Sequence, residues 1–332
     1  MAYTMREVAE RAGVSIATVS RVLSNTRYIS AETSRRVWEV VNQLDYRKNV
    51  HARRLATGRS DLFGLVISQI TNPYFPELIK GFQAAAWDSG FDVLLCNTEY
   101  APARAELVIE KLIENDVRGV AVMTASMDSG VAGGLIKAGI AVVFLDLKPA
   151  GRLVSNVGIN YQSGIVQAID HAIQLGHRRA AVIAGPENHR TATMIRRKLV
   201  SGLRSRQLDP CAVINCDWQV DAGASAIQAL LSSRRPPTVI FCGNDLLALG
   251  AMSALEEARV RVPEDISVIG IDDIAFAFLA RPALTTIRVP REELGRTAFA
   301  ALDRMCRLKR HRGAEYSLDT ELVVRKSTAP AR

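Results

Sequence analysis

The stretch MREVAERAGVSIATVSRVLSN, residues 5–25, has the pattern of two short helices joined by a tight turn. Thr4 and the glutamate three residues after it form a capping box at the start of the first helix. Gly13 is suited to the left-handed conformation that commonly follows the end of a helix. Ser15 can then cap a second helix over residues 16–23. Two helices joined by a glycine-containing turn form a helix-turn-helix.

The second helix of this pair exposes four residues on one side. They are Ile16, Ala17, Ser20 and Arg21, and a third helix is predicted over residues 31–44. In a helix-turn-helix the second helix enters the DNA major groove, where an arginine can bind a guanine edge and small hydroxyls can contact phosphates. An ordinary three-helix bundle, or a helix pair that binds another protein, is the alternative.

Charge is concentrated at the same end of the chain. The 332 residues are enough for two or three domains, and the net charge is +8. Residues 1–60 contain 11 Lys and Arg but only 5 Asp and Glu, a net charge of +6. Such a basic region favours a polyanionic partner, although a solvated charged helix surface would give the same count.

Composition and motifs exclude several classes of protein. No apolar run approaches the ~18 residues of a membrane span, and the first ten residues lack the apolar segment of a secretory signal. The five cysteines contain no C-x-x-C pair, so we expect core thiols and a cytoplasmic protein. No nucleotide-binding, hydrolase or metalloprotease motif is present, and the five histidines are scattered. We therefore expect no enzyme activity, no cofactor and no metal.

The run V-A-x-x-A-G-V-S-x-x-T-V-S-R-V-L, together with ISAETSRRVWEVVNQLDY, resembles the DNA-binding headpiece of the lactose repressor and galactose repressor (LacI/GalR) family. The resemblance implies a repressor that binds a palindromic double-stranded operator as a homodimer, with Ile16 and Ala17 at base-reading positions and Arg21 as a third contact. The full set of expected DNA contacts is Thr4, Ser15, Ile16, Ala17, Thr18, Ser20, Arg21, Asn25, Tyr46, Asn49, Ala52, Arg53 and Leu55.

Residues 47–60, RKNVHARRLATGRS, form a basic segment after this headpiece. By itself the segment indicates a charged linker, and a linker that never becomes ordered remains the alternative. In the resembling family it folds into a minor-groove helix whose leucine, here Leu55, wedges between base pairs. The family usually has proline where this chain has Lys48.

The remainder, residues 61–332, alternates short apolar runs with amphipathic segments. This alternation predicts parallel sheets covered on both faces, and its length predicts two such sheets. We place one lobe at about 61–160 plus 291–319 and the other at about 161–288 plus 320–327. Crossings between the lobes are expected near 154–160 and 285–290. The predicted fold is thus an all-α headpiece and hinge followed by a two-lobed α/β domain.

Polar residues follow the predicted strands, where ligands bind in open α/β sheets. They are Ser68, Asn72, Thr124, Asp146, Asn244, Asp245, Asp272 and Asp273, with Tyr74, Phe75, Trp218, Phe276 and Phe278 among them. Carboxylates and amides beside aromatic rings suit a sugar-like ligand. Alternatively, each Asp or Asn simply caps the next helix.

The runs TNPYFPELIKGF, VPEDISVIGIDDI and PALTTIR resemble the periplasmic-binding-protein-like effector domain of the same family, closest to its ribose-repressor branch. The expected effector contacts are Asn72, Tyr74, Phe75, Thr124, Asp146, Arg190, Arg197, Asn244, Asp245 and Asp272. Two positions depart from the family pattern, with Leu199 in place of an arginine and Val289 in place of a glutamine. Arg196, Arg197 or Lys198 are candidates to replace the first, and Arg190 favours an anionic effector. The alternative to a sugar-controlled repressor is a cytoplasmic sugar-binding protein, or a regulator of the same fold that responds to a sugar acid, a sugar phosphate or another, non-sugar metabolite.

Two other classes of protein remain as rivals. A transport-type sugar-binding protein needs an export signal and no basic headpiece, which is the reverse of this chain. An architectural DNA protein needs no polar cleft. We therefore predict a sequence-specific transcriptional regulator, a repressor, whose operator affinity depends on a small effector bound between the lobes.

Overall fold

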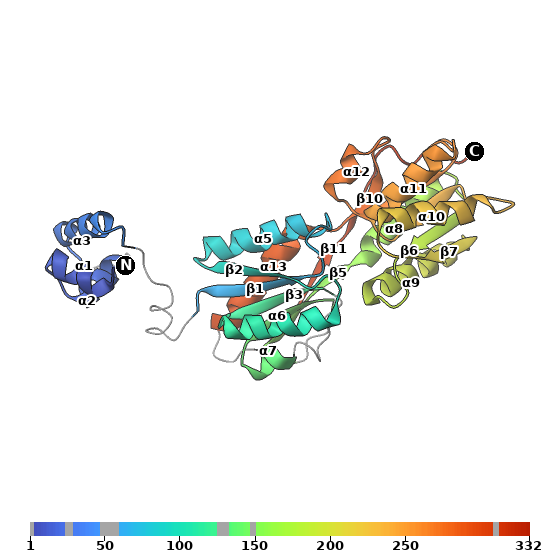
Figure 1. Cartoon of the computed structure of the whole chain (residues 1–332). Helices are drawn as coiled ribbons and strands as arrows, with labels where there is room; N and C mark the ends of the chain where they lie inside the picture. Colours follow the sequence, from blue (N-terminus) through green and yellow to red (C-terminus); the bar gives the residue numbers. More distant parts are fainter. Residues whose placement is uncertain (1–2, 24–28, 47–59, 125–132, 147–150, 308–311) are drawn as a thin grey trace. The chain divides into compact units, whose positions relative to one another are not determined.

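The computed structural model describes residues 3–23, 29–46, 60–124, 133–146, 151–307 and 312–332. The chain divides into two compact units, Met1–Ser60 and Asp61–Arg332. In Figure 1 the first unit is the small group of helices at the blue end of the colour bar.

The first unit is the predicted bundle of three helices, α1 (Met5–Ala12), α2 (Ile16–Leu23) and α3 (Ala31–Gln43). The capping box is confirmed, because Thr4 Oγ1 accepts a hydrogen bond from the Glu7 amide and the Glu7 carboxylate accepts one from the Thr4 amide at 2.7 Å. Gly13 has φ +64°, the left-handed conformation expected after a helix end. The core is small and mostly aliphatic, built from Val8, Ala9, Ala12, Val19, Val22, Val37, Val40, Val41, Leu44 and Tyr46.

The second unit contains two six-stranded sheets. The first sheet has the order β11-β5-β4-β3-β1-β2, with all its pairs parallel. Its strands are β1 (Leu62–Ile67), β2 (Asp92–Asn97), β3 (Gly119–Met123), β4 (Ala141–Leu145), β5 (Val154–Asn160) and β11 (Glu315–Asp319). Its helices are α5 (Phe75–Asp88), α6 (Pro102–Glu114), α7 (Gly133–Lys137) and α13 (Arg291–Arg307). We call this body lobe N.

Lobe N is covered on both faces, as a parallel sheet requires. Phe63 of β1 packs on the side of α5 and α13, where its ring meets Phe299 edge to face at 5.2 Å. Val66 of the same strand packs on the side of α6 and α7. Helices α5 and α13 approach closely at Gly81, where an added Cβ would lie 2.0 Å from the Glu292 carbonyl oxygen. Figure 1 shows α6 and α7 on the face opposite α5.

The second sheet has the order β12-β10-β9-β8-β6-β7 and forms the centre of lobe C. Its strands are β6 (Ala180–Ala184), β7 (Ala212–Asn215), β8 (Val239–Cys242), β9 (Ser267–Asp272), β10 (Thr285–Arg288) and β12 (Glu321–Val323). Its helices are α8 (Tyr161–Gln174), α9 (Arg190–Arg204), α10 (Val220–Leu231), α11 (Asp245–Glu257) and α12 (Ala275–Leu279). All pairs are parallel except β12 with β10.

The chain crosses between the lobes three times, from β5 to α8, from β10 to α13 and from β11 to β12. The first and third crossings are tied together by Thr320, which is buried. Its hydroxyl donates to the Asn160 carbonyl at 2.9 Å and accepts from the Gly164 amide at 3.0 Å. The lobes are therefore joined by adjacent strands rather than by one free linker.

Three strands, β7, β11 and β12, lie in stretches where the apolar runs gave no strand signal. All three are edge strands, and their burial alternates or is partial because only one face is covered. Edge strands of this kind lack the continuous apolar run of a central strand. No helix in the described part of the chain is both long and apolar enough to span a bilayer.

Candidate functional site

The exposed face of α2 in the headpiece presents the residues that the sequence placed there. Ser15 caps the helix, its Oγ accepting from the Thr18 amide at 3.1 Å, and the two hydroxyls are 2.9 Å apart. Val19 and Val22 are buried, while Ala17 and Arg21 are exposed. The side of α2 that carries Ile16, Ala17 and Arg21 is thus turned away from the core and suits entry into a groove.

Some of the expected DNA contacts have other roles or positions in the structure. Tyr46 is 8% exposed and packs in the headpiece core, so its ring is assigned to packing. Ile16 is an apolar residue left 45% exposed at the start of α2. The Thr4 side chain caps α1 through its hydrogen bond with the Glu7 amide. Asn25, Asn49, Ala52, Arg53 and Leu55 lie outside the described residues.

A cavity lies between lobes N and C, with about 580 Å³ of space free of protein atoms, part of it open to solvent. Its walls come from the carboxyl ends of strands in both sheets, as expected for open α/β sheets. The lining residues are Ser68, Asn72, Tyr74, Phe75, Tyr100, Met123, Thr124, Leu145, Tyr161, His189, Thr191, Ile195, Trp218, Gly243, Asn244 and Asp272.

Six of the predicted effector residues lie in this wall, namely Asn72, Tyr74, Phe75, Thr124, Asn244 and Asp272. The capping alternative also holds for Asn244, whose Oδ1 accepts from the Leu247 amide at 2.9 Å at the start of α11. Asn72 does not cap a helix, but its Oδ1 accepts from the Tyr74 amide at 2.9 Å in the turn before α5. These hydrogen bonds fix each amide side chain in place while leaving it in the cavity wall.

Asp245 differs from the prediction. Its side chain is 0% exposed and does not line the cavity. One carboxylate oxygen accepts from the Ile274 amide at 2.8 Å and the other from the Thr286 hydroxyl. As the first residue of α11 it points back beneath the sheet, so it supports the strand ends instead of meeting a ligand.

The predicted arginines also lie outside the wall. Helix α9 turns Ala192, Ile195 and Leu199 inward, which leaves Arg197 exposed. Arg196 instead donates to Asn215 Oδ1 at 2.8 Å. None of the described residues that line the cavity is a lysine or an arginine.

Arg190 and Asp146 lie close to the cavity without lining it. Arg190 is exposed at the start of α9, and its charge acts on the Asp146 carboxylate. Burial raises the pKa of Asp146 to about 6, against the hydrogen bond from the Ile159 amide at 2.9 Å and the charge of Arg190. The second carboxylate oxygen of Asp146 is buried and has no hydrogen-bond partner among the described residues.

Several wall residues were not among the predicted contacts. Tyr161 follows the first lobe crossing directly, and His189 and Trp218 precede α9 and α10. The rings of His189 and Trp218 are 4.4 Å apart and form one side of the cavity. The strand-end rule applies to all three. Trp218, which follows β7, was named among the aromatic residues of the predicted site but not among the expected effector contacts.

The carboxyl groups around Asp272 are electrostatically coupled. Burial, followed by the neighbouring Asp245, raises the pKa of Asp272 well above its usual value, and Arg291 opposes this shift. Burial also raises the pKa of Asp245 to about 7, against the hydrogen bonds from Thr286 and Ile274. Two close carboxylates disfavour double ionisation, so the pair tends to retain a proton near neutral pH.

This coupling predicts that the free energy of unfolding falls as pH rises. Between about pH 4 and 7 the folded protein holds a proton on Asp245 that the unfolded chain has released, because its pKa is raised from 3.8 to about 7. Each such group contributes up to ~1.4 kcal/mol per pH unit, and this stabilisation is lost as pH rises through the folded-state pKa. Urea unfolding at pH 5, 6, 7 and 8 measures it, and Asp245→Asn should flatten the decline. An equal slope in the two proteins would contradict the assignment.

The backbone around Asp272 is strained. Asp272 has φ +120° and Asp273 has φ +58°, values that favour glycine. The Asp273 carboxylate is held by Arg288 at 2.7 Å and by Arg325. Strain maintained by several contacts is typical of binding sites, because it fixes a side chain in an otherwise unfavourable orientation.

Comparison with known proteins accounts for both units. The family described as "Bacterial regulatory proteins, lacI family" matches residues 4–49, and "Periplasmic binding protein-like domain" matches residues 169–328. The HTH-type transcriptional repressor PurR of Photobacterium profundum is 33% identical over 331 residues, which cover 98% of each chain.

Solved structures agree. The lac repressor dimer bound to operator and the anti-inducer ONPF has a TM-score of 0.88 and 28% identity, covering 99% of this chain and 100% of that one. A LacI family regulator from Enterococcus faecium with bound ribose has a TM-score of 0.73 and 28% identity, covering 82% and 100%. The chain therefore belongs to the LacI family and is a DNA-binding transcriptional regulator with an effector domain.

Proposed function

We propose that the chain is a dimeric repressor whose operator affinity is controlled by a neutral, sugar-like molecule bound in the cavity between lobes N and C. The observation that carries the proposal is the composition of the cavity wall. Asp272, Asn72 and Asn244 offer acceptors and amides that pair with hydroxyl groups, beside the rings of Tyr74 and Trp218. Ribose is bound by the Enterococcus faecium relative.

The same wall argues against the sugar acid or sugar phosphate that Arg190 suggested. An anionic ligand would lie beside the Asp272 carboxyl group, with the buried Asp146 carboxyl group nearby. The described part of the wall contains no lysine or arginine that could pair with such a ligand. Burying an anion that has no cationic partner is costly, so the electrostatics favour a ligand rich in neutral donors.

Trp218 makes this proposal testable. The chain has three tryptophans, and Trp38 and Trp87 are 45% and 83% exposed, so Trp38→Phe with Trp87→Phe leaves Trp218 as the single reporter. We expect saturable fluorescence changes with D-ribose or D-galactose, and none with D-gluconate or ribose 5-phosphate. Asp272→Asn should weaken binding roughly 5- to 150-fold, because an amide cannot reproduce the hydrogen bonds of the carboxyl group and a ligand hydroxyl left unpaired costs about 1–3 kcal/mol.

Asp217→Asn is the matched control, since this exposed carboxylate adjoins Trp218 but does not line the cavity. Binding of the anionic sugars alone would overturn the proposed effector class. The ratio of operator Kd values with and without the bound sugar then measures the regulatory coupling.

We also propose where two copies of the chain meet. Helix α12 exposes Phe276, Phe278 and Leu279, whose side chains are 53%, 66% and 59% exposed. A cluster of large exposed apolar residues marks an interaction surface. A second copy of this chain is the fitting partner, because the lac repressor relative is a dimer on its operator.

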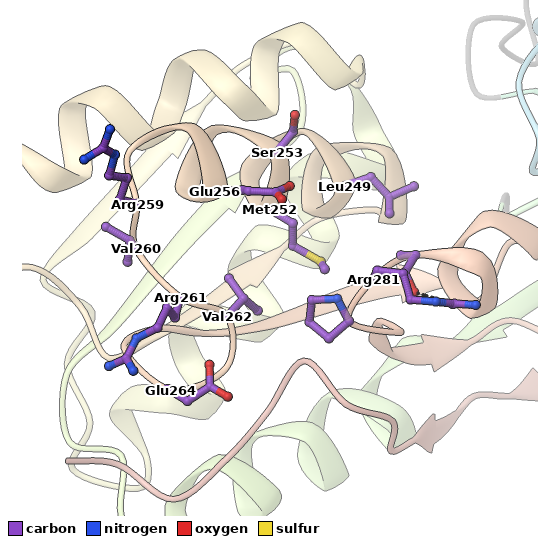
Figure 2. A pocket seen from close by; sticks show the side chains of 12 residues that line it. Leu249, Met252, Ser253, Glu256, Arg259, Val260, Arg261, Val262, Glu264 and Arg281 are labelled. Carbon is purple, nitrogen blue, oxygen red and sulfur yellow. Dashed lines mark hydrogen bonds between the residues drawn. The ribbon is translucent and has the colours of Figure 1, made fainter.

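A hollow next to α12 completes this surface. Figure 2 shows Leu249 and Met252 of α11 on one side of it and Val260 and Val262 in the loop that follows. The segment after α12 contributes Ala280 and Pro282 to the same hollow. The hollow also has charged residues in its lining, among them Glu256, Arg259 and Arg281. An apolar ridge beside this partly apolar hollow allows each of two copies to place its ridge in the hollow of the other, as a two-fold interface requires.

A further inference from the structure

Arg291 is a buried cation at the junction of the lobes. It is the first residue of α13, directly after the second crossing, and its side chain is 2% exposed. Arginine is seldom buried unless its charge is paired, so its partners indicate what it does.

The guanidinium group of Arg291 holds the strained loop of lobe C. Nη1 donates to the carbonyl oxygen of Asp272, and Nη2 donates to that of Asp273 at 2.8 Å. These are the two residues with positive φ at the end of β9. The planar fork of arginine suits this pair of acceptors better than the single point charge of lysine.

The same group also contacts lobe N. Nη2 donates to Glu77 Oε2 at 2.7 Å, and the guanidinium carbon lies 5.9 Å from the centre of the Tyr74 ring. Glu77 is in the first turn of α5, and Tyr74 is a cavity wall residue immediately before that helix. One side chain thus connects the wall residues Tyr74 and Asp272, which belong to different lobes.

The arrangement is not the best one for stability alone. Arg291 Nε is buried without a hydrogen-bond partner among the described residues, and Glu77 is 48% exposed. A buried donor left unpaired costs free energy, and a half-exposed ion pair recovers little. A function in positioning the lobes explains why such a group stands here.

We propose that Arg291 is a positioning residue that latches lobe C to lobe N and sets the orientation of Asp272 in the cavity. Closure of the lobes and binding of a ligand at Asp272 are then coupled through one side chain. The latch follows from the contacts alone, whereas its effect on ligand affinity rests on the proposed effector site.

Lobe closure can be measured without a ligand. We would replace Leu107 of α6 and Gln228 of α10, one exposed residue in each lobe, with p-azidophenylalanine and attach a nitroxide to each. Pulsed electron paramagnetic resonance then measures the distance between the two nitroxides, and therefore between the lobes. One labelled copy diluted in excess unlabelled protein limits signals between subunits. We expect a single narrow distance distribution for the unaltered sequence and a clearly broadened one for Arg291→Met, with Arg291→Lys between them.

Lys80→Met is the matched control. Lys80 pairs with Glu292 at 2.9 Å and also links α5 to α13, but both helices belong to lobe N. Its distribution should remain narrow. Glu77→Gln leaves the Arg291 guanidinium in place, so it should broaden the distance distribution less than Arg291→Met. It serves as a second test of the latch if Arg291→Met does not fold. An unchanged distribution in both Arg291→Met and Glu77→Gln would overturn the latch.

D-Ribose titrated against the Trp218 reporter tests the second part. We expect Arg291→Met to raise the Kd for D-ribose at least tenfold and Lys80→Met to leave it unchanged. If D-ribose fails to bind the unaltered sequence, the sugar proposal fails, while the distance distributions still decide whether Arg291 is a latch. If Arg291→Met bound D-ribose as tightly as the unaltered protein, Arg291 would not set the orientation of Asp272, and its positioning role would be contradicted.

Discussion

Replacing Arg21 with alanine is expected to remove the preference for one base pair in each operator half-site. Arg21 lies on the exposed side of α2, five residues beyond Ile16 at the helix start. A bidentate arginine contact to guanine contributes about 1–3 kcal/mol of discrimination, roughly 5- to 150-fold in affinity. The operator is first selected with the unaltered protein from a random library, and binding of both proteins to it is then compared.

A second selection from the same random library, made with Arg21→Ala, should return operator sites in which the base pair read by Arg21 is no longer specified. Arg35→Ala serves as the control, because Arg35 is exposed on α3 and carries the same charge. Loss of a phosphate contact would weaken binding about equally across sequences and reduce the salt dependence by about one charge. If Arg21→Ala behaves in that way, its assignment to base reading is wrong.

Replacing Phe278 with aspartate is expected to convert the dimer into monomers and to weaken operator binding by about 10²–10⁴-fold, because the two headpieces no longer bind as a linked pair. Phe278 is 66% exposed on α12, so the variant should fold with little loss of stability. Sedimentation velocity gives the mass, and a gel-shift titration of the selected operator gives the affinity.

Leu107→Asp is the matched control for this experiment. Leu107 is 64% exposed on α6 of lobe N and carries the same kind of apolar side chain. It should remain dimeric and bind the operator normally. A dimer that survives Phe278→Asp with full operator affinity would place the subunit interface on another surface.

Local signals in the sequence were sufficient for the headpiece. A serine cap depends only on residues three positions apart, so Ser15 could be assigned as a cap without knowledge of tertiary structure. The central strands were visible as apolar runs because both of their faces are buried. Strand-end positions then identified Asn72, Asn244 and Asp272 as cavity residues.

Side-chain direction and long-range contacts could not be obtained in this way. Asp245 is adjacent to Asn244 in sequence, but the first residue of α11 points beneath the sheet while the cap residue faces the cavity. Whether the Arg197 side chain faces the cavity or solvent depends on how α9 is rotated about its axis. The Arg291–Glu77 pair joins residues 214 positions apart, and no local pattern distinguishes Arg291 from an ordinary solvated arginine at a helix start.

The three lobe crossings have a consequence for the gene. Lobe N is completed only by residues 291–319, since Phe299 of α13 packs on Phe63 and Phe82 and β11 closes the sheet edge. A frameshift shortly before Glu315 would remove an edge strand from both sheets at once. Because each sheet takes strands from separate segments, we expect neither lobe to fold as a contiguous fragment. Late stop codons should therefore act as complete loss-of-function alleles rather than yield a DNA-binding protein that ignores its effector.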